Sequence, residues 1–253
     1  MKTAIILTGQ MRTFEACLPT LRHHVFNRIP GDLAFFVATV ADANAIKANL
    51  LRKEFPDAQV EVSAVLEQPD CIAELRGLGC NLPKEWTPGR HYTFEPFKIS
   101  VHPQSVARQL WQLRKGWELF LAKGTPSEFD NVIRVRPDLF FHSFAWPQPR
   151  FGGHPEVLTP WWGAFGGVND RFAILDVANG AAADYFLTYS AIPKLLAAGV
   201  PFHPESLIAA SVATHETGLC MAEFSTLREG GELRAPEITN FDFANLLAGM
   251  AAR

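Results

Sequence analysis

The sequence of 253 residues is poor in cysteine and has no excess of positive charge, and each shortage excludes a class of protein. Its four cysteines form no Cys-x-x-Cys pair and have no histidine at metal-ligand spacing: Cys17, Cys71, Cys80 and Cys220. A structural zinc site and a disulfide framework are therefore not indicated, and this usage is typical of the reducing cytoplasm. The net charge is −3 and no basic block occurs, so no nucleic-acid partner is predicted.

Long hydrophobic runs and the familiar glycine motifs are also missing. The N-terminal run MKTAIILTGQ meets Gly9 too soon for a signal peptide or a membrane span, and it predicts a first strand. There is no Gly-x-Gly-x-x-Gly fingerprint and no Gly-Lys-Ser/Thr of a Walker loop. No Gly-x-Ser-x-Gly elbow occurs either, which leaves a serine hydrolase without support.

What the sequence does contain is a regular alternation of short apolar strands and amphipathic helices. Hydrophobic residues make up 48% of the chain, which is enough for a large core. We expect strands and helices to alternate at the start of the chain, over residues 3–8, 13–27, 32–40, 44–55 and 58–65. This rhythm predicts an α/β fold with a mostly parallel central sheet and helices on both faces.

The pattern resumes after an interruption. Residues 66–101 are rich in proline, glycine and aromatic residues and predict a long irregular insertion. The clearest helix follows at 103–124, and a single strand is predicted at 129–141. Beyond it we expect two extended pieces, two helices and a closing strand, at 157–176, 181–199, 204–218 and 219–230. No repeat or flexible linker divides the sequence, so a single domain spanning 1–253 is predicted.

The loops after the first two predicted strands are candidate binding elements, because ligands of open α/β sheets bind where strands end. In TGQMRT, Gly9 lets the backbone approach a ligand, and Arg12 would meet a phosphate at the start of the next helix. A tight turn with a solvated arginine explains this spacing equally well. Asp42, after the second strand, either accepts hydrogen bonds from a ribose or a base, or caps the next helix.

The stretch FDNVIRVRPDLFF, residues 129–141, has the most unusual pattern. Side chains alternate across a strand, so Arg134, Arg136 and Asp138 are predicted to share one face. Two guanidinium groups on one face are costly to bury without anionic partners. One explanation is an internal ladder of salt bridges. The other is that the arginines face a phosphate, while Asp138 is a ligand for a divalent metal or a sugar hydroxyl.

Two later stretches add polar candidates. Asn169 and Asp170 form a polar pair in WWGAFGGVNDRFAILD, whose aromatic side chains are suited to stacking on sugars or bases. A β-turn explains this pair equally well. In HPES, Glu205 lies in the first turn of a predicted helix, where plain helix initiation also accounts for a carboxylate.

Taken in order, these motifs resemble those of GT-A-like glycosyltransferases associated with bacterial surface polysaccharides, of the capsule and lipopolysaccharide type. The resemblance rests on TGQMRTF, FDNVIRVRPDLFF, GGVNDRFAI and HPESLIAA, and it runs from Ile5 to about Gly218. It implies a GT-A-like, Rossmann-related sheet with a nucleotide-binding half at about 1–140 and an acceptor-side half at about 141–253. It also implies transfer of a sugar from a nucleotide-sugar donor to a glycan or lipid-linked acceptor.

The resemblance implies roles for individual residues as well. Nine residues would bind the donor: Thr8, Gly9, Gln10, Arg12, Asp42, Arg134, Arg136, Asp138 and Asn169. Asp170 would be the base that deprotonates the acceptor hydroxyl in an inverting reaction, with Glu205 as the second candidate. A retaining reaction would need neither residue in that role.

One position departs from the wider GT-A pattern. Where the metal-binding D-x-D motif has two acidic residues, this chain has Arg136 and Asp138, so a positive charge replaces one ligand. The family implies Mn²⁺ or Mg²⁺ bound by Asp138 and the donor diphosphate. A guanidinium group, however, neutralises diphosphate charge by itself, so the sequence leaves both arrangements open.

Other functions and a membrane contact also stay open. Another nucleotide-dependent transferase, such as a nucleotidyltransferase, would use the same arginine-rich strand, and so would a catalytically silent module that binds a sugar nucleotide or a glycan. The predicted location is the cytoplasm, at the inner face of the membrane. There, Trp161, Trp162 and the C-terminal FANLLAGMAAR would touch the surface that holds a lipid-linked acceptor, although a short helix packed on the core explains this tail as well.

Overall fold

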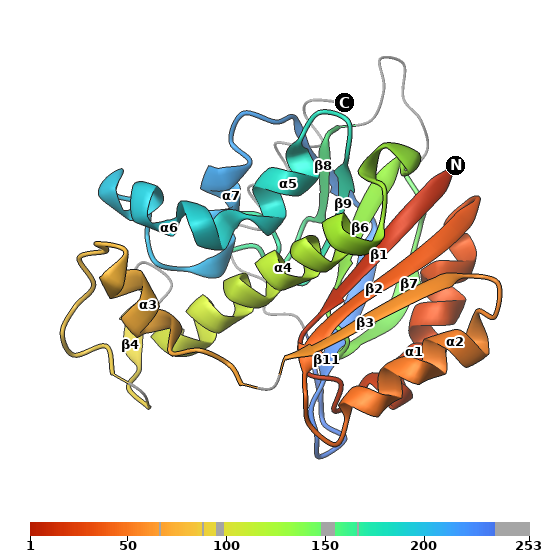
Figure 1. Ribbon diagram of the computed structural model, residues 1–253, viewed down its shortest axis with the longest axis horizontal. Helices are drawn as coiled ribbons and strands as arrows, with labels where there is room; N and C mark the ends of the chain where they lie inside the picture. Colours follow the sequence, from red (N-terminus) through yellow and green to blue (C-terminus); the bar gives the residue numbers. More distant parts are fainter. Residues whose placement is uncertain (66, 88, 95–98, 148–154, 166, 236–253) are drawn as a thin grey trace.

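The computed structural model describes residues 1–65, 67–87, 89–94, 99–147, 155–165 and 167–235. Within these ranges a seven-stranded sheet forms the centre of the molecule, in the order β10-β8-β9-β6-β1-β2-β3 (Figure 1). Its strands are β1 (Lys2–Thr8), β2 (Asp32–Val40), β3 (Gln59–Val65), β6 (Asn131–Val135), β8 (Val157–Pro160), β9 (Phe172–Asp176) and β10 (Thr217–Cys220). A smaller antiparallel sheet, in the order β12-β11-β7, consists of β7 (Leu139–Phe144), β11 (Ala222–Leu227) and β12 (Leu233–Arg234).

The helices surround the central sheet. They are α1 (Phe14–His24), α2 (Asn49–Glu54), α3 (Cys71–Gly77), α4 (Pro103–Lys123), α5 (Ala181–Phe186), α6 (Thr188–Ala197) and α7 (Pro204–Ser211). Short 3-10 turns occur at Phe26–Arg28, Ala45–Ala48 and Pro126–Glu128, and a two-stranded hairpin joins β4 (Tyr92–Phe94) to β5 (Ile99–Val101). None of the helices in the described ranges is long and apolar enough to cross a membrane.

The central sheet is mostly parallel, as the sequence predicts. Strand β1 runs parallel to both β2 and β6, β2 runs parallel to β3, and β8 runs parallel to β10. Strand β9 alone among these seven is antiparallel to its neighbours β6 and β8. The predicted α/β class, with a mostly parallel sheet covered by helices, is therefore confirmed.

Both faces of the sheet are covered, because its central strands are apolar on both sides. In β1, Ala4 and Ile6 pack in a core with α4 and the helices α5 to α7, whereas Ile5 and Leu7 pack on the other side with α1. Figure 1 shows α4 crossing one face of the sheet, with α1 and α2 on the opposite side. The described residues thus form two hydrophobic cores, one on each side of the central sheet.

Helix α4 lies very close to β1. A Cβ atom added at Gly116 would lie 2.4 Å from Cγ2 of Thr8 and 2.7 Å from Cγ2 of Ile6. Glycine at this position therefore permits a close approach of the helix backbone to the strand. The approach sets the polar face of the preceding turns of α4 beside the carboxyl end of β1, where the candidate site lies.

The expected strand over 129–141 is interrupted, which corrects the sequence prediction. Strand β6 ends at Val135, and β7 begins at Leu139 in the smaller sheet. Proline has no N–H for a sheet ladder, and Pro137 lies in the turn between the two strands. Arg134 therefore belongs to β6, whereas Arg136 and Asp138 lie in this turn and are not alternate positions of one strand.

Four other predicted elements also differ from the structure. The strand expected at 219–230 is two strands, β10 and β11, which belong to different sheets. The helix expected at 181–199 is interrupted at Leu187, and the one expected at 204–218 ends at Ser211. The insertion at 66–101 is not wholly irregular, because α3 and the β4–β5 hairpin lie within it. Asp70 caps α3 by accepting a hydrogen bond from the N–H of Ala73 at 3.1 Å.

Candidate functional site

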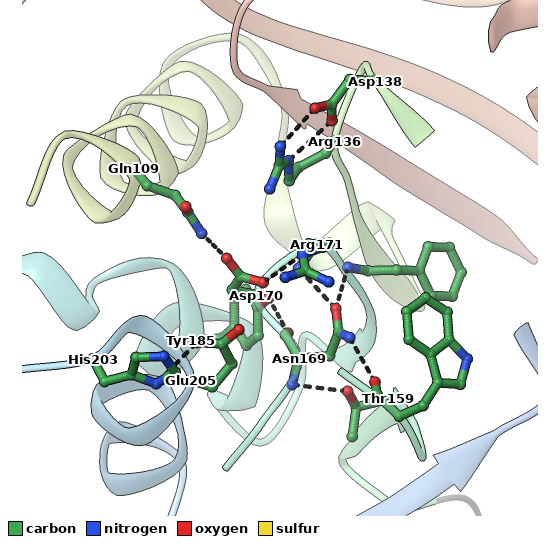
Figure 2. Close-up of polar contacts among 12 residues, drawn as sticks. Gln109, Arg136, Asp138, Thr159, Asn169, Asp170, Arg171, Tyr185, His203 and Glu205 are labelled. Carbon is green, nitrogen blue, oxygen red and sulfur yellow. Dashed lines mark hydrogen bonds and ion pairs between the residues drawn. The ribbon is translucent and has the colours of Figure 1, made fainter. Parts of the chain in front are cut away.

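The turn after β6 presents a fork of two hydrogen bonds between Arg136 and Asp138 (Figure 2). Nε of Arg136 donates to Oδ1 of Asp138 at 3.0 Å, and Nη2 donates to Oδ2 at 2.6 Å. The N–H of Arg136 donates to the carbonyl of Arg171 at 3.0 Å, which holds the turn against the start of β9. Burial alone would lower the pKa of Arg136, but Asp138 and Asp170 outweigh it and raise the pKa.

Arg134 is the most deeply buried of these charged side chains. It is 1% exposed, and one of its guanidinium nitrogens donates to the carbonyl of Val135. Within the described residues its Nε has no hydrogen-bond partner, and no carboxylate forms an ion pair with it. Burial lowers the pKa of Arg134 to about 10, although Tyr185 and the nearby acids oppose this shift. A buried guanidinium without an anionic partner is costly, so Arg134 is a candidate for pairing with an anionic ligand.

Arg134, Arg136 and Asp138 line one cavity of about 610 Å³, which we call the strand-edge pocket. It lies where β1 and β6 end. Two carboxylates among the described residues line it, Asp138 and Glu229. Five arginines also line it: Arg12, Arg108, Arg134, Arg136 and Arg228. The pocket is thus strongly positive in a chain whose net charge is −3.

The loop after β1 forms one wall of the strand-edge pocket. Thr8, Gly9, Gln10 and Arg12 all line it, so four predicted donor-binding residues lie together with the arginines of β6. Gly9 has a φ of +135°, and a Cβ atom added there would lie 3.3 Å from Cδ of Pro137. This close approach joins the loops after β1 and β6 into one continuous wall.

A polar stripe of α4 forms the facing wall, and the sequence reading missed it. Four residues at helical spacing line the pocket: Ser105, Arg108, Gln109 and Gln112. They lie opposite the apolar face of the helix, where Val106, Leu110 and Leu113 are buried. A polar stripe at this spacing is visible in the sequence, but it reads as an ordinary solvated face until the fold brings it to the strand ends.

The turn between β11 and β12 closes the pocket from a third side. Leu227, Arg228, Glu229 and Gly230 line the pocket, and Nη1 of Arg12 lies 3.1 Å from Oε2 of Glu229. Both partners of this ion pair are exposed, with 49% and 70% of their side-chain surface accessible. The pair is therefore a weak contact between two rims of the pocket.

Asp170 is buried behind the pocket wall. Its side chain is 4% exposed, Gln109 donates a hydrogen bond to Oδ2, and Nε of Arg171 lies 3.4 Å from Oδ1 (Figure 2). Burial alone would raise the pKa of Asp170, but Arg171 and Arg136 outweigh burial and lower it. Asp170 is thus an ionised carboxylate at neutral pH. Gln109 touches both the pocket and this carboxylate.

Glu205 is also buried, but its pKa shifts in the opposite direction. Its Oε2 lies 3.1 Å from Nδ1 of His203, and both side chains are nearly inaccessible. Burial and the charge of Asp170 raise the pKa of Glu205 well above its ordinary value. Burial lowers the pKa of His203 to about 4, and its ring stacks on Phe94 with centroids 4.2 Å apart. The raised pKa of Glu205 and the lowered pKa of His203 both disfavour the charged forms of these two groups.

Two predicted donor-binding residues have structural partners and do not line the strand-edge pocket. Asn169 is fully buried, and its Oδ1 accepts from the N–H groups of Arg171 and Phe172 at 2.9 and 3.1 Å. Its Nδ2 donates to the carbonyl of Trp162 at 3.0 Å, so this side chain holds the turn before β9. Asp42 accepts from the N–H of Asn44 at 2.8 Å in the loop after β2, and Asn44, not Asp42, is the N-cap residue of the following helical turn. Donor binding by either residue stays a prediction.

The two tryptophans predicted to contact a membrane both pack in the protein. Trp162 is 2% exposed, and its Nε1 donates to the carbonyl of Ala222 at 2.9 Å, so it belongs to the core. Trp161 is half-buried and packs against the same core. The C-terminal segment FANLLAGMAAR lies outside the described residues.

The side chains described here do not fit a divalent cation held by protein ligands. Both carboxylate oxygens of Asp138, the predicted ligand, accept hydrogen bonds from Arg136. No group of three or more His, Cys, Asp or Glu side chains with metal-binding geometry occurs in the described part of the chain. A metal-binding role for Asp138 stays a prediction, and the observed geometry gives this carboxylate a guanidinium partner.

Comparison with family models found no match, and no curated protein matches the chain. Among solved structures, the fold is similar to mouse xyloside xylosyltransferase 1 in its apo form, with a TM-score of 0.44 and 9% identity over 87% of this chain and 85% of that chain. It is also similar to the mannosyltransferase PcManGT of Pyrobaculum calidifontis in complex with GDP-Man and Mn²⁺, with a TM-score of 0.39 and 11% identity over 87% of this chain and 55% of that chain. These scores are too low for the likeness to assign a role to any residue.

Proposed function

We propose that the protein is a glycosyltransferase that moves a sugar from a nucleotide-sugar donor to a glycan or lipid-linked acceptor. The observation that carries the proposal is the strand-edge pocket, which five arginines and two carboxylates line. A ligand with several negative charges and a polar body suits such a pocket. A diphosphate that joins a nucleoside to a sugar has both properties.

The arginines would act on the leaving group. In glycosyl transfer the bond between the anomeric carbon and the diphosphate oxygen breaks, and negative charge develops on the diphosphate. Arg134 and Arg136 lie at the end of β6, where they would face this charge from a partly buried wall. Fixed positive groups in a site shielded from water stabilise developing charge more strongly than water does.

Asp170 is the preferred base for an inverting reaction. The acceptor oxygen would attack the anomeric carbon while the carboxylate takes the hydroxyl proton. The pKa of Asp170 is lowered by Arg171 and Arg136 against the effect of burial, whereas the pKa of Glu205 is raised, which supports Asp170 over Glu205. Gln109 now donates to Asp170, so this amide would have to give way to the acceptor hydroxyl.

Finer parts of the proposal rest on the resemblance of motifs. We propose that the acceptor belongs to a bacterial surface polysaccharide and that the protein works in the cytoplasm at the inner face of the membrane. We also propose one domain over 1–253. In its support, β6 from the nucleotide half and β9 from the acceptor half pair directly in one sheet.

A catalytically silent module that binds a sugar nucleotide is the second candidate. The observation in its favour is that neither Asp170 nor Glu205 lines the strand-edge pocket. Both are almost fully buried, at 3% and 2% exposure. Such a module would bind the donor and leave it intact.

One experiment separates these functions. The purified chain is incubated with a panel of UDP-, GDP-, ADP- and CMP-linked sugars and with polysaccharide fragments, and the products are followed by mass spectrometry. A glycosyltransferase releases the nucleotide and adds a sugar mass to the acceptor. A nucleotidyltransferase adds a nucleotide mass instead, which would overturn the proposal. Donor binding without any product would favour the silent module.

A further inference from the structure

We propose that Arg228 joins Arg134 and Arg136 in a guanidinium cradle that binds the donor diphosphate without a divalent cation held by protein ligands. The inference rests on the proposed function and adds a residue that no sequence motif indicates. It also proposes that guanidinium groups neutralise the charge of the diphosphate, whereas the motif resemblance implies that Mn²⁺ or Mg²⁺ does so.

The position of Arg228 is set by a hairpin that reaches the turn after β6. The N–H of Leu227 donates to the carbonyl of Asp138 at 2.9 Å, so the end of β11 is fixed beside that turn. Arg228 follows directly, and its N–H donates to the carbonyl of Glu232 at 2.8 Å. The side chain of Arg228 lines the strand-edge pocket together with those of Arg134 and Arg136.

Arg136 repels both of the other arginines of the cradle, because its charge lowers the pKa of Arg134 and that of Arg228. Burial lowers the pKa of Arg228, and the charges of Arg234 and Arg136 lower it further. Burial is also the main cause of the lowered pKa of Arg134, to which Arg136 contributes. An anion bound among these groups would relieve the repulsion and, at the buried Arg134, the cost of burial.

The charges available in the cradle suit a diphosphate. Among the described residues, neither Arg134 nor Arg228 forms an ion pair, whereas Arg136 is paired with Asp138 at 2.6 Å. Three guanidinium charges and one carboxylate leave a net charge of two. A diphosphate within a nucleotide sugar carries one negative charge on each phosphate, so the cradle neutralises it without another cation.

Asp138 has a different role in this arrangement from that of a metal ligand. Its oxygens accept from Nε and Nη2 of Arg136, which fixes the plane of that guanidinium group. The remaining nitrogen of Arg136 stays available to a phosphate oxygen. Asp138 is therefore a positioning residue, and the group that would contact the phosphate is Arg136.

The chain offers a matched control for Arg228. Like Arg228, Arg234 in β12 is an exposed arginine of this hairpin, but it does not line the pocket. Replacing either residue with glutamine removes one positive charge from the same surface region. Only Arg228→Gln, however, removes a group from the cradle.

The test measures nucleotide binding by calorimetric titration in EDTA and again with Mn²⁺ or Mg²⁺. The probes are UDP, GDP, ADP and CDP, each beside its monophosphate. We expect one diphosphate to bind in EDTA with a Kd within about threefold of its value with metal. We expect Arg228→Gln to weaken diphosphate binding about tenfold or more, because hydrogen bonds to charged groups are strong. Arg234→Gln should change it less than about twofold. Monophosphate binding should depend less on Arg228.

Two outcomes separate failure of the cradle from failure of the proposed function. Binding of a diphosphate only with metal, or equal effects of Arg228→Gln and Arg234→Gln, would overturn the cradle and leave a nucleotide-dependent enzyme in place. Binding of no nucleotide to the wild-type protein under either condition would overturn the proposed function itself. Matching circular dichroism spectra and melting temperatures of the two variants exclude a folding defect as the cause.

Discussion

Arg136 holds both carboxylate oxygens of Asp138, with Nε 3.0 Å from Oδ1 and Nη2 2.6 Å from Oδ2. The two residues are separated only by Pro137, so this fork is built locally by the turn after β6. It makes the single acidic residue of the RVRPD stretch one half of an ion pair. The expected behaviour of Asp138 variants therefore differs between a metal site and a guanidinium cradle.

Asp138→Asn should keep nucleotide binding within about threefold of wild type, with or without Mn²⁺, because the amide oxygen still accepts from Arg136. Titration with the preferred nucleoside diphosphate checks this. A loss of tenfold or more that appears only when Mn²⁺ is present would identify Asp138 as a metal ligand after all.

Asp170→Asn should lower kcat by about 10²–10⁴-fold, while the donor Kd changes little, because the amide accepts a hydrogen bond but takes no proton. Product formation and donor titration measure the two effects separately. Glu205→Gln is the matched comparison, since the raised pKa of Glu205 disfavours its ionised form and its replacement should leave kcat within about tenfold. Equal turnover in wild type and Asp170→Asn would remove Asp170 from the reaction.

Glu205→Gln should stabilise the protein increasingly as the pH rises. The folded pKa of Glu205 lies above its ordinary value of 4.5, so the unfolded chain loses this proton first. The stability contribution of Glu205 is therefore fully present below about pH 4.5 and is lost as the pH rises through the folded pKa. The glutamine variant does not titrate, so its unfolding free energy should rise relative to that of wild type between pH 4.5 and pH 7.5.

Urea denaturation at pH 4.5, 6.0 and 7.5 measures the unfolding free energy of wild type and of Glu205→Gln. The buffers are matched in ionic strength. A difference between variant and wild type that does not change with pH would mean that the Glu205 pKa is not raised in the folded protein.

Gly116→Ala should destabilise the fold by about 1–3 kcal/mol, because its Cβ atom has no room between α4 and β1. That atom would lie 2.4 Å from Cγ2 of Thr8. Gly77→Ala in α3 is the control, since a Cβ there meets nothing within 4 Å and alanine favours helices. Thermal unfolding of the two variants makes the comparison. Equal melting temperatures would show that α4 shifts without cost.

The order of strands and helices at the start of the chain could be predicted because it depends on local pattern. The apolar run of β2 and the helical spacing of Phe14, Cys17, Leu18 and Leu21 in α1 both survive in the structure. The break after Val135 could not be predicted from alternation, because the outcome depends on pairing with β9 on one side and with β11 on the other. Pro137 was the local sign of that break.

The residues of the candidate site also fall into those that local motifs predict and those that depend on long-range packing. The loop after β1 and the arginines of β6 are contiguous motifs, and the fold brings them to one pocket. Neither Gln109 nor Arg228 could be assigned to the pocket from the sequence, because α4 and the β11–β12 hairpin reach the pocket only through long-range packing. Asn169 stands out as a polar residue in the sequence, but its side chain forms hydrogen bonds within the turn before β9.

The buried guanidinium of Arg134 links the stability of the protein in a cell to the presence of an anionic ligand. An unpaired charge that is 1% exposed lowers the stability of the ligand-free chain, so any anion that pairs with it favours the folded state. A ligand at about a hundred times its Kd adds about 2.7 kcal/mol, which is enough to change how much of a marginally stable protein escapes proteolysis. The amount of this protein would then rise and fall with the supply of its own substrate.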